Sequence, residues 1–121
     1  MNEITFRAKT TRLFLLFAMR AEIGEWASLI DAAIEEVRRE TRADADPFDI
    51  RLSYYAAALA NLRYRQILAV QGALSPTYAG SVRANRDDSQ PVSLAVRLYL
   101  AYRSAAAELL DDGGFVMILA G

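Results

Sequence analysis

The chain contains no cysteine and no histidine. Without cysteine it has neither a disulfide framework nor a thiol nucleophile. Without histidine it lacks the commonest general base and the commonest metal ligand, and every Cys/His type of zinc site is excluded. A sequence without these residues cannot form most kinds of enzyme active site, so we expect a protein that is not an enzyme and that carries no cofactor.

Lysine is nearly absent as well, since Lys9 is the only lysine among 14 basic residues. A GC-rich genome is the simplest explanation of this bias, although arginine also suits ion pairs at interfaces better than lysine does. The net charge is −1. The overall charge therefore gives no reason to expect binding to nucleic acid or to a membrane surface.

Long hydrophobic runs are missing too. The longest one near the N-terminus, Leu13 to Met19, is far shorter than the ~20 residues that span a bilayer. It has no small-residue cleavage site, and Arg20 and Glu22 follow it directly, which argues against a signal peptide. We expect a cytoplasmic protein without a membrane span.

What the sequence does have is helical periodicity. Its 121 residues are enough for one domain, residues 1–121, and 54% of them are apolar. Apolar residues recur at spacings of three and four in four segments. These segments are Glu3 to Ala21, Ile23 to Glu40, Asp46 to Gln71, and a stretch from Ser89 or Gln90 to Gly113. The pattern predicts an all-α domain resembling a four-helix bundle, although Ile4 to Ala8 also alternates like a short strand.

The Asp46 to Gln71 segment is the most informative part of the chain. Asp46 can cap a helix, and Pro47 suits the first helical position. The apolar arc of this helix is much wider than a normal amphipathic stripe, so neighbours must cover it on almost every side. A chain this short has few helices for that purpose. We therefore expect a second copy, or another protein, to complete the covering.

Two segments interrupt the helical pattern. Residues 74–90 contain Gly, Pro, Ser, Asn and Asp at the density of a loop, and we expect a long extended arm there, with Thr77 to Val82 fully extended. Phe115 to Leu119 is a short apolar run that predicts a C-terminal strand. A strand needs a partner, which could be Thr77 to Val82, the N-terminal Ile4 to Phe6, or a strand of another molecule. Pro91 is expected in the first turn of the last helix.

A few polar residues are candidates for a site. Arg63 lies within the apolar stripe of its helix, so its charge must be paired or must reach the surface. We expect a pair with Glu35, Asp31 or Glu108, or else with a carboxylate of another subunit. Arg83 and Arg86 could meet phosphate or an acidic patch of a partner. The Asp44, Asp46, Asp49 cluster lacks the glycine and the distal glutamate of a calcium loop, and helix capping accounts for two of the three.

Four stretches carry a resemblance to a known family. They are W-x-x-L-I-D-A-A-I-E-E-V from Trp26, D-x-R-L-S-Y-Y-A-A-A-L-A-N-L-R-Y-R from Asp49, T-Y-A-G-S-V from Thr77, and G-G-F-V-M-I-L from Gly113. Together they resemble small prophage proteins of Gram-positive bacteria that are similar to the head–tail connector (adaptor) proteins of tailed phages. The resemblance extends from Trp26 to Leu119.

The resemblance implies a structural subunit of the virion neck, assembled in the host cytoplasm. In that family a helical bundle with an extended arm forms a ring beneath the portal protein, usually a dodecamer. The ring meets tail or head-completion proteins, and DNA passes through it without specific binding. The alternative is a small helical dimeric binding or regulatory module. The expected interface residues are Arg63, Tyr78, Val82, Arg83, Arg86, Phe115, Val116, Met117, Ile118 and Leu119.

Overall fold

A computed structural model describes residues 1–74 and 78–111, and of residues 73, 74 and 78–89 it describes the backbone alone. The main helices are α1 (Glu3–Ala18), α2 (Ala27–Glu40), α3 (Ile50–Leu74) and α4 (Tyr78–Ala105), and short 3-10 turns lie at Gly24–Trp26 and Ala107–Leu109. Within the described part of the chain Thr41 and Leu110 form a single antiparallel bridge and there is no strand. The predicted all-α fold is confirmed.

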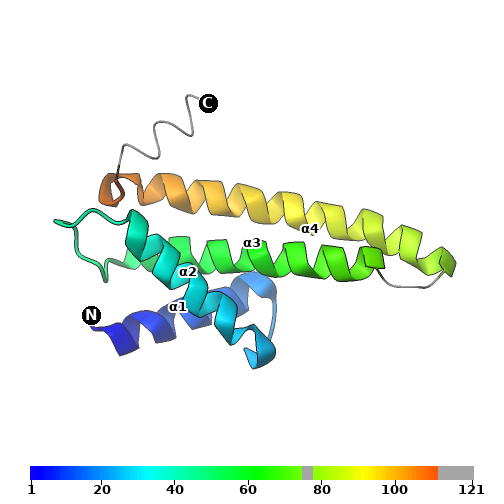
Figure 1. Ribbon diagram of the computed structural model, residues 1–121, viewed down its shortest axis with the longest axis horizontal. Coiled ribbons are helices and arrows are strands. Elements are labelled where there is room, and N and C mark those ends of the chain that lie inside the picture. Colours follow the sequence, from blue (N-terminus) through cyan, green and yellow to red (C-terminus); the bar gives the residue numbers. More distant parts are fainter. Residues whose placement is uncertain (75–77, 112–121) are drawn as a thin grey trace.

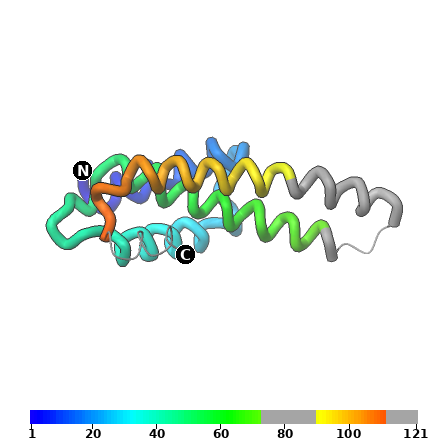
Figure 2. Tube along the Cα trace, turned by 90° about the horizontal axis from the view of Figure 1, so that it is seen from above, coloured from blue at the N-terminus to red at the C-terminus, as the bar shows by residue number. Residues whose placement is uncertain are grey.

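Helix α3 is the centre of the molecule and contacts each of the other main helices. Helix α4 runs antiparallel along one side of α3, and α1 and α2 lie across the opposite side (Figure 1). Seen from above, α1 and α2 diverge toward opposite edges of the α3–α4 pair (Figure 2). The arrangement is a long helical hairpin with two shorter helices packed against one part of it.

The lengths of the helices explain this shape. At about 1.5 Å per residue, α3 and α4 extend about 37 and 42 Å, whereas α1 and α2 extend only about 24 and 21 Å. The shorter helices therefore cover only part of the hairpin, which projects beyond them (Figure 1).

The core lies where the four helices meet. It is built from large side chains of α1 and α2 packed against a run of small ones on α3, where Ala56, Ala57, Ala58 and Ala60 are completely buried. Aromatic rings complete the packing near the C-terminal end of α1, where Tyr64 meets Phe14 and Trp26 edge to face. The principal large core residues are Phe6, Leu13, Phe14, Ile30, Ile34, Val37, Leu52 and Tyr55.

The predicted start of the third helix is wrong by a few residues. Helix α3 begins at Ile50. Asp49 acts as its cap, because its Oδ1 accepts the backbone N–H of Arg51 at 2.9 Å. Asp46 instead closes a turn by accepting the N–H of Phe48 at 2.9 Å. Both aspartates therefore serve the backbone, and the helix starts at the second of them.

The expected extended arm is also wrong for most of its length. Helix α4 begins at Tyr78, so the backbone of residues 78–90 is helical, and only residues 75–77 of the segment lie outside the described residues. Pro91 lies well inside α4 rather than in its first turn. A single glycine costs a helix only ~1 kcal/mol and one proline ~3 kcal/mol, and packing against α3 offsets such costs.

The predicted strand Phe115 to Leu119 lies outside the described residues. Its first candidate partner is removed, however, because residues 78–82 are helical. Its second candidate, Ile4 to Phe6, is part of α1.

Candidate interaction surfaces

Of the residues expected at an interface, Arg63 alone has a described side chain. Tyr78, Val82, Arg83 and Arg86 lie on the backbone of α4, with their side chains outside the described residues. Phe115, Val116, Met117, Ile118 and Leu119 lie outside the described residues altogether.

Arg63 is partly buried and paired with a carboxylate of its own chain, as one of the two sequence expectations had it. The partner is Glu36 on α2, with side-chain exposures of 33% and 40%. None of the three carboxylates expected from the sequence is the partner. Each of those belongs to another arginine in the structure: Asp31 to Arg7, Glu35 to Arg39 and Glu108 to Arg51.

A buried polar cluster that sequence reasoning missed joins three helices. Arg103 on α4 is only 7% exposed, and its Nη1 donates to the Tyr55 hydroxyl of α3. The same nitrogen lies 3.2 Å from both carboxylate oxygens of Glu40 at the end of α2 and 3.3 Å from the hydroxyl of Tyr99. Tyr99 and Arg103 are four residues apart on one helix face, a spacing that could have indicated the cluster.

The electrostatics of this cluster favour a structural role. Burial raises the pKa of the Tyr55 hydroxyl far above its ordinary value, and the adjacent Glu40 carboxylate, which accepts its proton in a hydrogen bond, raises it further. Tyr55 therefore keeps its proton near neutral pH and donates it to Glu40 in a hydrogen bond. With Arg103 and Tyr55 closed to solvent, the cluster holds α2, α3 and α4 together at the end of the hairpin that the shorter helices cover.

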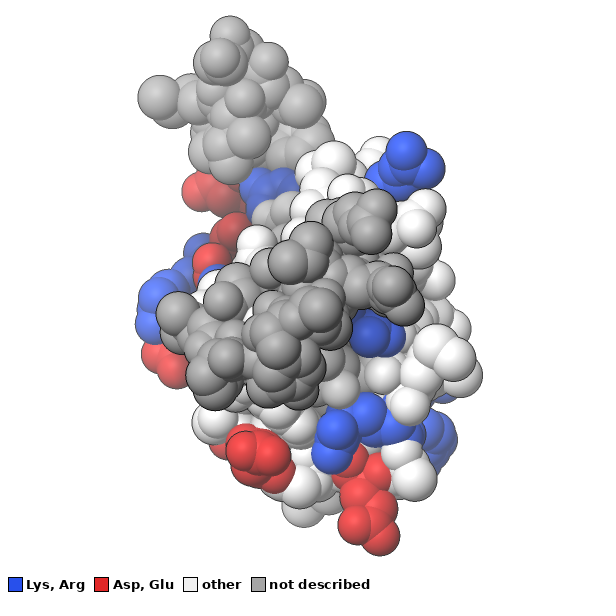
Figure 3. All heavy atoms as spheres, turned by 90° about the vertical axis from the view of Figure 1, so that its right-hand side faces the viewer, with Lys and Arg blue, Asp and Glu red and all other residues white. Residues whose placement is uncertain are grey.

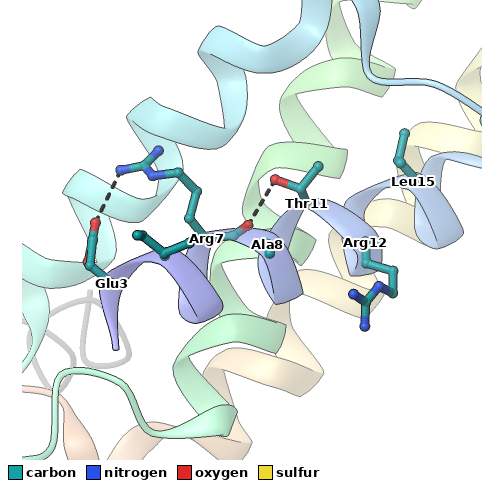
Figure 4. A pocket seen from close by; sticks show the side chains of 7 residues that line it. Glu3, Arg7, Ala8, Thr11, Arg12 and Leu15 are labelled. Atoms are coloured by element: carbon teal, nitrogen blue, oxygen red, sulfur yellow. Dashed lines mark hydrogen bonds and ion pairs between the residues drawn. The ribbon is translucent and has the colours of Figure 1, made fainter. Parts of the chain in front are cut away.

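A shallow furrow runs along the side of α1 that faces away from the core (Figure 4). Its volume is about 540 Å³, and its lining includes the apolar Ile4, Ala8 and Leu15 together with Arg12. Arg7 at its edge is engaged, because it pairs with both Glu3 and Asp31. The furrow thus combines apolar side chains with positive charge.

A second groove, here called the α1–α4 groove, lies between the end of α1 and the middle of α4. Its volume is about 430 Å³, and it is lined by Phe17, Met19, Asn61, Arg65, Pro91, Leu94, Ala95 and Leu98. Met19 and Leu94 are 86% and 57% exposed. At its floor, Asn61 is buried, and its Oδ1 has no hydrogen-bond partner among the described residues.

A third hollow, the α2–α3 groove, lies where the hairpin extends past the beginning of α2. Its volume is about 360 Å³, and it is lined by Leu29, Arg63, Gln66, Ile67, Val70 and Gln71. Leu29 and Ile67 rest against the core, while Val70 is 57% exposed.

At the end toward which the hairpin projects, the described charged side chains do not form a face of one sign. There, acidic and basic residues lie close to one another (Figure 3). Among the residues that the structure describes, no group of three or more acidic side chains is placed to hold a metal ion, and no helix is both long and apolar enough to cross a membrane. Asp44, the remaining member of the acidic cluster, pairs with Arg42 at 2.9 Å.

Comparisons with protein-family models, with curated proteins and with solved structures find no match to this chain.

Proposed function

We propose that the chain is a structural subunit of a tailed-phage head–tail connector, which forms a ring beneath the portal protein, with a dodecamer as the expected state. The resemblance of the segments from Trp26, Asp49, Thr77 and Gly113 to prophage connector proteins supports this role. The same resemblance suggests tail or head-completion proteins as further partners and DNA as the passing cargo.

The observation that carries the proposal is the exposed apolar surface at the α1–α4 groove. Met19 and Leu94 stand on opposite walls of this groove, and Leu16 is exposed nearby on α1. Monomeric soluble proteins rarely expose a contiguous apolar patch without a use for it. The unpartnered Oδ1 of Asn61 at the floor favours a protein occupant that brings a hydrogen-bond donor, because a buried acceptor left unpaired costs ~1–3 kcal/mol.

A second copy of the chain is the occupant that we propose. The furrow on α1, lined by Ile4, Ala8 and Leu15, is an apolar surface distinct from the α1–α4 groove. When one surface of a subunit binds a different surface of the next, the contact is heterologous, and such contacts close into a ring if the rotation between copies permits. Arg12 borders the furrow. In such a contact, Arg12 of one copy could donate a hydrogen bond to the unpartnered Oδ1 of Asn61 in the next copy.

The test is assembly of the purified chain, alone and with the portal protein of the same prophage, followed by mass photometry and electron microscopy. The unmodified chain should form rings or bind the portal. A Met19→Asp/Leu94→Asp variant should remain a folded monomer, because it places charges in the apolar interface. A matched control, Ala101→Asp on an exposed position of α4, should assemble like the unmodified chain.

Two results would contradict the proposal. The first is a chain that stays monomeric with and without the portal. The second is a stable dimer that ignores the portal, which would favour a small helical dimeric binding module instead.

A further inference from the structure

The α2–α3 groove has the composition of a site for an extended peptide. Its apolar lining comes from Leu29 and Ile67, which rest against the core, and from Val70, which is 57% exposed. Its rim carries the amides of Gln66 and Gln71, whereas Arg63 is already paired with Glu36. The groove therefore offers an apolar floor and neutral hydrogen-bonding groups above it.

Glutamine amides suit an extended backbone because each can both donate and accept hydrogen bonds. An extended peptide has unpaired N–H and C=O groups along both edges, and its alternate side chains point to opposite faces. One set of side chains can thus enter the apolar floor while the backbone meets the rim. A helix would gain less here, because its backbone groups are already paired.

The chain itself contains such a peptide. Phe115 to Leu119 is five consecutive apolar residues, preceded by Gly113 and Gly114. The partners predicted for it as a strand within the chain are helical in the structure. A segment of this composition needs another apolar surface to cover it, since unpaired apolar strands aggregate.

The point at which the described chain ends decides which groove this segment can reach. The N–H of Asp111 donates to the carbonyl of Glu40 at 2.7 Å, and the N–H of Arg42 donates to the carbonyl of Leu109 at 2.9 Å. Asp111 therefore lies beside the C-terminal end of α2. Leu29 of the groove lies near the opposite end of the same helix.

The distances agree with this placement. From Glu40 back to Leu29, α2 covers about 16 Å. Measured from Asp111, a fully extended chain reaches about 14 Å at Phe115, about 20 Å at Met117 and about 27 Å at Leu119. Met117 and Leu119 can therefore reach as far as Leu29, while Phe115 stays nearer the C-terminal end of α2. We propose that Phe115 to Leu119 binds in the α2–α3 groove of its own chain as an extended peptide that runs antiparallel to α2. This inference does not rest on the connector role, and it leaves the α1–α4 groove free for contacts between copies.

Because the chain has no cysteine, introduced cysteines report on this contact without background. In full-length protein, Val70→Cys together with Met117→Cys should form a disulfide within one chain under mild oxidation. The matched control combines Met117→Cys with Leu94→Cys, whose position is equally exposed but lies in the α1–α4 groove. The control disulfide should form at least about tenfold more slowly, since the effective concentration of two thiols falls when they are not held together.

A second measurement uses the full chain with Val70→Cys alone. Replacing Phe115, Met117 and Leu119 together by serine should raise the alkylation rate of this thiol by about tenfold, with unchanged circular dichroism. The thiol of Leu94→Cys should not respond to the same replacement. Equal cross-linking in both cysteine pairs, disulfides only between chains after mixing single-cysteine proteins, or an alkylation rate that ignores the serine replacements would each overturn the proposal.

Discussion

The first half of α3, from Leu52 to Ala60, is almost entirely buried, whereas the second half, from Leu62 to Gln71, is mostly half-exposed or exposed. Apolar residues occupy most positions of both halves, although they are denser in the first. The neighbouring helices add to this difference, because α1 and α2 cover the first half closely and the second only in part, through contacts such as Phe14 on Tyr64 and Glu36 with Arg63. An apolar helix face thus forms part of the core in one place and a groove in another.

The same contrast holds for the ion pairs. Arg103 lies among Tyr55, Glu40 and Tyr99 at the covered end and is almost closed to solvent. Arg63 pairs with Glu36 on the second half of α3, where both side chains remain about one-third exposed. Burial rather than pairing distinguishes the two arginines, and burial determines how much each pair contributes to stability.

The largest expected effect sets the two halves of α3 against each other directly. Leu52→Ala should lower the free energy of unfolding by about 3 kcal/mol, because it leaves a cavity in a fully buried site. Val70→Ala should lower it by no more than about 1 kcal/mol, because Val70 is 57% exposed among the described helices and the binding proposed for Phe115 to Leu119 would cover it only in part. Urea unfolding of both variants measures the difference, and equal losses would show that the second half of α3 is packed as tightly as the first.

A comparable effect is expected at the buried cluster. Arg103→Met should lower the free energy of unfolding by about 3 kcal/mol, the lower end of the ~3–5 kcal/mol expected for a broken buried pair, because Glu40 keeps some contact with water. Adding Glu40→Met should restore part of the loss by removing the unpaired charge. Arg97→Met on the exposed side of α4 is the control. If the double variant proved less stable than Arg103→Met, the charge of Glu40 would not be the cause.

Arg63→Met should cost less than about 1 kcal/mol, because a pair that remains partly in water contributes little. Thermal melting of this variant beside Arg39→Met, which loses the exposed pair with Glu35, should give similar small shifts. A loss above about 2 kcal/mol would show that the Arg63 pair contributes to stability like the buried Arg103 pair.

The smallest effect concerns pH at the start of α3. The hydrogen bonds from the Arg51 side chain hold the pKa of Asp49 below its ordinary value in the folded protein. A lowered folded pKa stabilises the fold above the unfolded pKa, about 3.9, and this contribution is lost as the pH falls through the folded value. Asp49→Asn should therefore be slightly less stable than the unmodified chain at pH 7, and the gap should narrow below about pH 4. Urea unfolding of both proteins between pH 3 and pH 7 measures this difference in the free energy of unfolding. A difference that stays constant over this range would contradict the prediction.

Much of the fold could be predicted from particular residues. The spacing of Ile30, Ala33, Ile34 and Val37 predicts a core-facing helix, and all four are buried. The α1 pattern is less informative: Phe14 and Leu16 belong to the same apolar run, yet Phe14 is fully buried and Leu16 is 70% exposed. An apolar helix with a broad arc does not specify which of its sides meets the core.

Local signals and tertiary packing disagree most clearly between Leu74 and Gln90. Gly80 lies in a segment whose Gly, Pro, Ser, Asn and Asp residues predicted an arm, and Pro91 was expected in the first turn of the helix after it. The structure continues α4 through both, because the neighbouring α3 supplies packing that a sequence window does not contain. Arg63 also shows what a local pattern cannot predict. Several carboxylates lie on α2, and only the relative placement of α2 and α3 selects Glu36 as its partner.

The sequence by itself determined the all-α class, the presence of four main helices and the unusually apolar character of the third, because periodicity and composition are local properties of the chain. Only the tertiary structure decided which length of α3 is covered, that Arg103, Tyr55 and Glu40 meet, and where the grooves open. The physical reason is that burial depends on how far the neighbouring helices reach. That reach follows from the lengths and crossing of α1 and α2 in space, and no single segment of the sequence contains it.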